Sequence, residues 1–163
     1  MKTDGNIPPR HPALPPLGEA LEFMRLVWAV DHAWQRISKR MEARFGVTAP
    51  QALVIGIVGR FPGILAGQLA QILHVHPSTL SGVLQRLERQ GLLSRRADPR
   101  DRRRAALGLT ARGRQLRQEV ERHLDSAVRH ALERLPRTKM RHAREVLAIL
   151  ARRLDAGLAP QLR

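Results

Sequence analysis

Apolar residues recur at intervals of three and four along most of this chain of 163 residues, which is the spacing of a helix face. The longest such stretch runs from Leu17 to Gly46 and carries two apolar stripes. A helix that is apolar on two sides is buried on two sides, so its own domain can cover one stripe and another subunit the other. The first stripe is Phe23, Val27, Val30, Trp34, Ile37, Met41 and Phe45, and the second is Leu17, Leu21, Met24 and Trp28.

Helical spacing continues in shorter stretches after Gly46. Thr48 and Gln51 form a capping box for the first of these, with Pro50 in its first turn. The expected helices are Thr48 to about Arg60, 64–73, 77–90, Thr110 to Pro136, and a last one capped by Thr138. The last helix has a narrow apolar seam that suits packing between two chains. This seam is Met140, Ala143, Leu147, Leu150 and Leu154.

The pattern changes to that of short strands between Gly91 and Thr110. Residues 92–96 and 104–109 are expected to be strands, and the residues between them, from Ala97 to Asp101, have turn chemistry. The predicted fold is therefore mainly α with one small β-hairpin that follows a pair of helices.

That pair, over 64–90, is typical of a helix-turn-helix. The second helix turns an apolar face inward and a face of hydroxyls, an amide and arginines outward. Such side chains reach base edges and phosphates in a major groove. The outward residues are Ser78, Gly82, Gln85 and Arg89, flanked by Thr79, Ser81 and Arg86.

The net charge of +15 indicates a polyanionic partner, either nucleic acid or an anionic membrane surface. Residues 91–117 hold nine arginines and two aspartates, so about half of this excess falls on the hairpin and its flanks. An arginine-rich hairpin beside a recognition helix is a wing, and its tip can enter a narrow minor groove. The clustering favours DNA over a membrane.

These segments resemble the MarR family of bacterial transcription regulators over residues 47–115. The resemblance rests on Leu69-Ala70, Ser78-Thr79-Leu80-Ser81, Leu87-Glu88-Arg89-Gln90-Gly91-Leu92, Asp98-Pro99-Arg100-Asp101-Arg102-Arg103 and Leu109-Thr110-Ala111-Arg112-Gly113. It implies a winged helix-turn-helix over 47–115, flanked by dimerisation helices over 17–46 and 116–158. It also implies a homodimer that represses transcription, with Arg103 in the minor groove and Asp101 orienting it.

Two positions depart from the family pattern. Leu65 stands where a serine or threonine usually caps the third helix, and Gly82 stands where a larger residue is usual. The first turn of that helix is therefore expected to be displaced, and no operator sequence carries over. The predicted DNA-contacting residues are Ser78, Thr79, Ser81, Gln85, Arg86, Arg89, Arg100, Asp101, Arg103, Arg112 and Arg114.

Family resemblance also implies release from DNA by a small aromatic or anionic effector. Trp28 and His32 are four residues apart on one helix, so they share a face that would suit an aromatic acid. The alternative is a metal-responsive regulator. The histidine pairs His74/His76 and His123/His130 do not have a compact helical ligand spacing, although Glu119 or Asp125 could complete a site. No metal ligand and no cofactor are assigned.

Several classes of protein are excluded. The chain has no cysteine, which removes disulfides and thiol switches, and it lacks the phosphate-binding and nucleophile motifs of enzymes. RNA-binding modules usually display stacking aromatics, and here none follows Phe61. A sequence-nonspecific architectural DNA-binding protein remains an alternative.

The N-terminus has no signal-peptide pattern, so a cytoplasmic protein is expected. Residues 1–16 contain five prolines and are expected to form a flexible arm.

Overall fold

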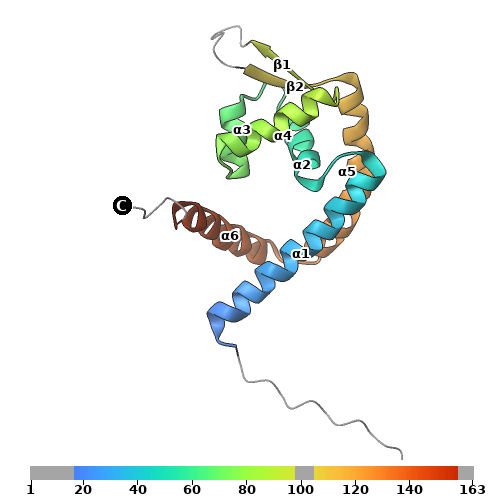
Figure 1. Ribbon diagram of the computed structural model, residues 1–163. Coiled ribbons are helices and arrows are strands. Elements are labelled where there is room, and N and C mark those ends of the chain that lie inside the picture. The colour runs from blue at the N-terminus through green and yellow to red at the C-terminus, as the bar shows by residue number, and fades with distance from the viewer. Residues whose placement is uncertain (1–16, 98–104, 158–163) are drawn as a thin grey trace, which may run out of the picture.

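The computed structural model describes residues 17–97 and 105–157, apart from the side chains of 123–131 and 155–157. Within these ranges the chain forms six helices and one antiparallel hairpin (Figure 1). The helices are α1 (Glu19–Phe45), α2 (Ala49–Arg60), α3 (Ala66–Leu73), α4 (Pro77–Arg89), α5 (Ala111–Glu133) and α6 (Arg137–Gly157), and the strands are β1 (Leu93–Ala97) and β2 (Ala105–Leu109). The prediction of a mainly α fold with one small hairpin is confirmed. The predicted arm over 1–16 lies outside the described residues.

Local capping fixes most of these boundaries. Thr48 Oγ1 accepts the Gln51 N–H at 3.4 Å, and Gln51 Oε1 accepts the Thr48 N–H at 2.9 Å, which completes the expected box. Gly46 and Gly91 follow the ends of α1 and α4 with φ of 71° and 67°, a left-handed conformation that glycine adopts without strain.

Two expected helix starts are shifted. The third helix begins at Ala66, two residues later than expected, and Leu65 stands before it without a side-chain cap. Gln68 Oε1 partly compensates, because it accepts the Leu65 N–H at 3.0 Å. The expectation that Thr138 caps the last helix is wrong. The Pro136 carbonyl already accepts the Met140 N–H at 3.2 Å, so α6 begins at Arg137 and Thr138 lies in its first turn.

A single core fills the winged part of the molecule, and α2 lies at its centre. Helix α2 packs against α1, α3, α5 and β2, and half of its residues are buried. The fully buried side chains come from α2, α3, α4, β2 and the turn before α2, so these elements share one core. The largest of them are Ile55, Leu69, Leu84, Leu87, Leu107, Val47, Val54 and Val58.

Besides its two strands, the wing includes a third segment that pairs with β2 through backbone hydrogen bonds, which the sequence did not indicate. Gly63 N–H donates to Leu107 O at 2.9 Å, and Leu107 N–H donates to Ile64 O at 2.9 Å. Leu65 and Ala106 add an antiparallel bridge. The loop between α2 and α3 therefore extends the β1–β2 ladder and attaches the root of the wing to the helix-turn-helix.

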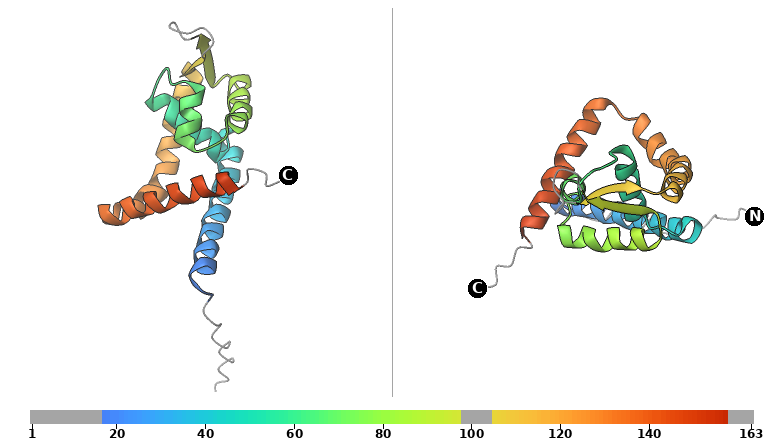
Figure 2. Two further views of the ribbon diagram at one scale, coloured as in Figure 1. Left: turned by 90° about the vertical axis from the view of Figure 1, so that its left-hand side faces the viewer. Right: turned by 90° about the horizontal axis from the view of Figure 1, so that it is seen from above.

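Large apolar side chains remain exposed on the N-terminal half of α1 and on α6. Helix α6 runs transverse to α1 and lies below the winged part in the left view of Figure 2. None of the helices within the described ranges is both long and apolar enough to cross a membrane. The exposed residues of the two helices are Leu21, Phe23, Met24, Leu26, Trp28, Val30, Val146, Leu147, Ile149 and Leu154.

Helix α5 approaches the end of α4 very closely at Gly113. A Cβ on Gly113 would lie deep inside van der Waals contact of the Leu92 carbonyl oxygen and 3.0 Å from its carbonyl carbon. Both are backbone atoms, so they cannot turn aside as a flexible side chain can. Only glycine fits at this position without moving α5.

We predict that Gly113→Ala lowers the free energy of unfolding by about 2–4 kcal/mol, because overpacking against rigid backbone forces α5 away from the core. Urea unfolding followed by circular dichroism measures the loss. Gly67→Ala is the matched control, since its added Cβ meets no atom within 4 Å in a helix. That control should be neutral or more stable by up to about 1 kcal/mol. Equal stability of the two variants would contradict the close approach.

Candidate nucleic-acid interface

Helix α4 presents the predicted polar row to solvent. Leu80, Leu84 and Leu87 are buried against the core, whereas all six predicted DNA-contacting residues of α4 are exposed. The side chains of four of these, Thr79, Ser81, Gln85 and Arg89, make no hydrogen bond within the described part of the chain. Their donors and acceptors are therefore available to a ligand. The six exposed residues are Ser78, Thr79, Ser81, Gln85, Arg86 and Arg89.

The start of α4 is capped by a histidine. His76 takes the N-cap position, and its Nδ1 accepts the Ser78 N–H at 3.3 Å and lies 2.7 Å from Ser78 Oγ. An accepting Nδ1 requires the neutral tautomer protonated on Nε2. Pro77 follows at the first helical position, where the missing N–H costs nothing. Neighbouring His74 ends α3 in a left-handed conformation with φ of 51°.

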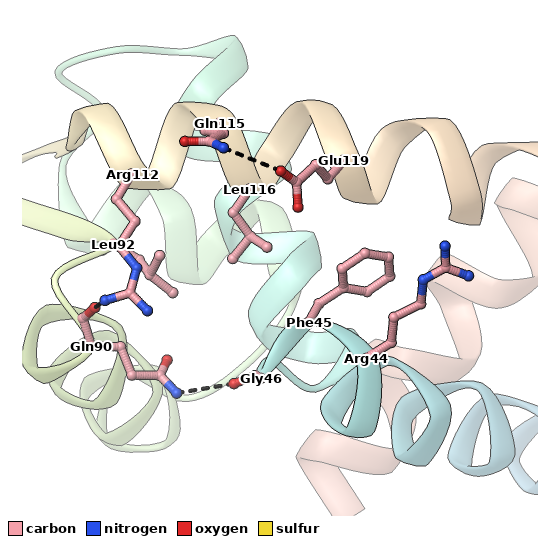
Figure 3. A pocket seen from close by; sticks show the side chains of 9 residues that line it. All are labelled: Arg44, Phe45, Gly46, Gln90, Leu92, Arg112, Gln115, Leu116 and Glu119. Carbon is pink, nitrogen blue, oxygen red and sulfur yellow. Dashed lines mark hydrogen bonds between the residues drawn. The ribbon is translucent and has the colours of Figure 1, made fainter.

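The end of α4 is tied to α1 and α5. Arg86 Nη2 donates to Glu42 Oε1 at 3.1 Å, and Gln90 Nε2 donates to the Gly46 carbonyl at 3.0 Å. Arg112 Nη1 donates to the Gln90 carbonyl at 3.2 Å (Figure 3). These contacts hold the recognition helix to both long helices, a role that the sequence did not indicate for Arg86 or Arg112. A guanidinium has five donors, so both arginines keep N–H groups for a phosphate.

Arginines also surround the root of the wing. Arg95 on β1 pairs with Glu88 on α4, and Arg114 Nη1 donates to the Leu109 carbonyl at 2.9 Å. Both contacts link the hairpin to a helix. Of the predicted wing residues, Arg100, Asp101 and Arg103 lie outside the described residues.

Trp28 and His32 lie together as expected. Their rings are stacked, with centroids 5.4 Å apart and planes 12° from parallel. Trp28 is 66% exposed, so this pair stands on the surface of the single chain.

Three hollows in the described structure are lined by residues other than Trp28 and His32. One, of about 370 Å³, lies between the ends of α1 and α4 and the start of α5, and Gln90, Arg112 and Glu119 help to line it (Figure 3). A second, of about 290 Å³, is mostly apolar and lies between α1, α2 and α5. The third, of about 520 Å³, lies behind the wing.

The described residues contain no cluster of three or more side chains that could hold a metal ion. His76 Nδ1 is occupied by the helix cap, and Glu119 accepts a hydrogen bond from Gln115 at 3.4 Å. The side chains of His123, His130 and Asp125 lie outside the description.

Comparison with known proteins finds a family model and several relatives among transcriptional regulators. A model described as "MarR family" matches residues 45–104. The HTH-type transcriptional repressor Rv2887 of Mycobacterium tuberculosis is 30% identical over 102 residues, which are 63% of this chain and 73% of Rv2887. The HTH-type transcriptional regulator TtmR of Methylorubrum extorquens is also 30% identical, over 58% of this chain. That match spans only about half, 49%, of TtmR.

Solved structures share the fold. FabT of Streptococcus pneumoniae in complex with DNA superposes with a TM-score of 0.63 at 20% identity, over 85% of this chain and 99% of FabT. CouR of Rhodococcus jostii RHA1 bound to p-coumaroyl-CoA superposes with a TM-score of 0.67 at 22% identity, over 83% of this chain and 96% of CouR. At these identities the likeness establishes the winged-helix fold.

We predict that His76→Ala lowers the free energy of unfolding by about 1 kcal/mol, because the Ser78 N–H loses its acceptor. His76→Asn should recover most of the loss, since its side-chain oxygen can accept the same bond. Urea unfolding of the three proteins at pH 8 measures the difference. If the alanine and asparagine variants are equally unstable, the capping role is wrong.

Proposed function

Because the chain belongs to the MarR family of transcriptional regulators, we propose that it is a homodimeric repressor that binds a pseudo-palindromic operator and is released by a small effector. As a regulator rather than an enzyme, it would act in the cytoplasm, where bacterial DNA lies. The observation that carries this proposal is the exposed polar row of α4, which is flanked by arginines and has four side chains without a hydrogen-bond partner in the described part of the chain.

Sequence-specific DNA binding fits this row and its surroundings. Gln85 lies at the centre of the outward face and has an amide that can pair with an adenine edge. Arg112 and Arg114 lie in the first turn of α5 beside the wing, where their spare donors can contact phosphate. In this proposal Arg103 enters the minor groove, Asp101 orients it and Arg100 adds a phosphate contact. Rv2887 is named a repressor, and FabT was solved on DNA.

The exposed apolar side chains of α1 and α6 support the proposed homodimer. A patch of this kind is costly in water and marks an interaction surface. It lies on α6 and on the N-terminal half of α1, both below the winged part in Figure 1, so a partner there leaves α4 free. A two-fold dimer would place two recognition helices on successive turns of one DNA face.

Control by an effector is proposed at the Trp28–His32 stack. One face of an exposed indole can receive another aromatic ring, and an imidazole can pair with a carboxylate. The partner subunit would cover this part of α1 in the proposed dimer and close the site. CouR, which shares the fold, was solved with p-coumaroyl-CoA bound. A ligand releases DNA only if it binds the DNA-incompetent state more tightly.

For dimerisation, we predict that the protein sediments as a dimer at micromolar concentration and that Leu147→Glu shifts it to monomer. Leu147 is exposed in the single chain, so a carboxylate there should harm the dimer and not the fold of the monomer. Ile72→Glu on α3 introduces the same charge outside the proposed interface and should leave a dimer. A wild-type monomer would overturn the proposal.

For DNA recognition, we predict that Arg103→Ala weakens operator binding by about 1–3 kcal/mol without unfolding the protein. Gln85→Ala should change the preference among operator variants. Arg112→Ala and Arg114→Ala should weaken all sequences alike and reduce the salt dependence by about one unit for each lost contact. Fluorescence anisotropy over a salt series measures both effects.

Operators come from genome-wide recovery of bound fragments. Equal affinity for operator and random DNA would favour the architectural alternative. The assignment of roles fails if Gln85→Ala weakens every sequence equally while the arginine variants alter preference.

For control, we predict that an aromatic acid found by thermal shift releases the operator and loses this effect in Trp28→Ala, while that variant still binds DNA. Peroxide should not release DNA, because the chain has no cysteine to oxidise. A compound that acts equally on both proteins binds elsewhere. Release controlled only by zinc or a chelator would replace this proposal with a metal-responsive one.

A further inference from the structure

The hollow behind the wing differs in charge from the other two. Three arginines, Arg96, Arg114 and Arg117, line its volume of about 520 Å³, and none of its described lining residues is acidic. Each of the other two hollows has a glutamate in its wall, Glu119 or Glu121. The wall of this hollow therefore carries positive charge and no negative charge, although Arg117 pairs with Glu121 outside the lining. Its volume is in the range of small-molecule sites.

Two of the three guanidinium groups are held in place by the protein. Arg114 donates to the Leu109 carbonyl at 2.9 Å, and Arg117 Nε donates to Glu121 Oε1 at 2.6 Å. Arg117 also crosses from α5 to α2, where it lies against the backbone of Gly59. A Cβ on Gly59 would meet Arg117 Nη1 at 2.5 Å and Cδ at 2.6 Å, so this side-chain position depends on the glycine.

The arginines around this hollow keep unused hydrogen-bond donors. The three guanidiniums carry five N–H donors each. Arg114 and Arg117 each use one in the contacts above, and the Arg96 guanidinium makes no hydrogen bond in the described part of the chain. Three like charges facing one space are stabilised by an anion with several acceptor oxygens. A phosphate group is that kind of anion.

The remaining lining is small or apolar. Gly63 and Gly108 let a ligand approach the backbone, and Pro62 and Leu109 add apolar surface. A lone phosphate would occupy a small part of this volume. The composition fits a phosphate attached to an organic body.

From these observations we propose that the hollow between the wing, α2 and α5 is a phosphate-binding site. Its arginines come from β1 and α5, so a bound phosphate would join the wing to the long helix that follows it. The phosphate can belong to a small organic phosphate or to the DNA backbone. The first source is independent of the proposed function, and the second rests on it.

Isothermal titration calorimetry of the full chain in 150 mM salt tests the small-molecule source, with pyrophosphate and ADP as probes and adenosine as the uncharged control. Two variants address the site. Arg96→Gln removes an exposed charge that holds nothing in place, and Gly59→Ala displaces the Arg117 guanidinium without changing the net charge. Arg40→Gln on α1 is the matched control, because it removes one exposed charge from a residue that does not line the hollow.

We expect micromolar binding of pyrophosphate and ADP that weakens about tenfold or more in both site variants, as expected for lost charge-assisted hydrogen bonds. Arg40→Gln should change the affinity for both probes by less than about twofold, since salt screens a charge that does not line the site. Adenosine should not bind.

The second arm measures the affinity of the same variants for a DNA duplex. If the site variants weaken DNA binding more than Arg40→Gln and neither phosphate probe binds, the site takes a phosphate of the DNA backbone. If millimolar probe binding is the same in all variants, the hollow holds an adventitious ion only and the proposal is overturned. The proposal is also overturned if probe affinity falls only in proportion to the net charge removed, so that Gly59→Ala binds the probes as tightly as the wild type. Probe binding by a chain that binds no DNA would keep this site and reject the proposed function.

Discussion

The Leu92 carbonyl lies at the point where the functional parts of this molecule meet. It accepts the Thr110 N–H at 3.2 Å and lies directly against the Cα of Gly113. Thr110 Oγ1 donates to the neighbouring Gly91 carbonyl at 2.7 Å and accepts the Gly113 N–H at 3.0 Å. The end of the recognition helix, the root of the wing and the start of α5 therefore meet at one point. Since α5 continues toward α6, a movement of the long helices would reach α4 and the wing together.

The described arginines of this chain fall into two groups according to whether they bond to another element of the protein. Some act within the fold, because Arg86, Arg112 and Arg114 each donate to a protein acceptor that joins two elements. Others, such as Arg89 and Arg96, have no such acceptor in the described structure and face solvent or a hollow. A guanidinium can do both at once because its five donors lie in a fixed plane. High positive charge is therefore compatible with a well-ordered domain.

The molecule has one part with a buried apolar core and another with exposed apolar side chains. The winged part buries its large side chains around α2, whereas the N-terminal half of α1 and much of α6 expose theirs. The two-stripe pattern of α1 indicated this outcome, since a single domain can cover one face only. In the single chain even part of the first stripe, Phe23 and Val30, is exposed. The winged part alone has a complete core.

What the sequence determined by itself is local. The Thr48–Gln51 box, the Thr110 cap and the glycines after α1 and α4 act within a few residues, so their chemistry could be read directly from the chain. The exposed row of α4 followed from helical periodicity. The shifted start of α6 shows the limit of such reading, because Pro136 and Thr138 compete for one cap within a single turn.

Only the tertiary structure decided which distant groups meet. The Gly63–Leu107 and Arg86–Glu42 contacts join residues 44 apart in sequence, and the Arg117 side chain on α5 packs against Gly59 on α2. No periodicity or spacing encodes these pairs, since they depend on how α2 and α5 pack. The same packing brings arginines from β1 and α5 around one hollow, whereas the sequence shows only that the region is basic.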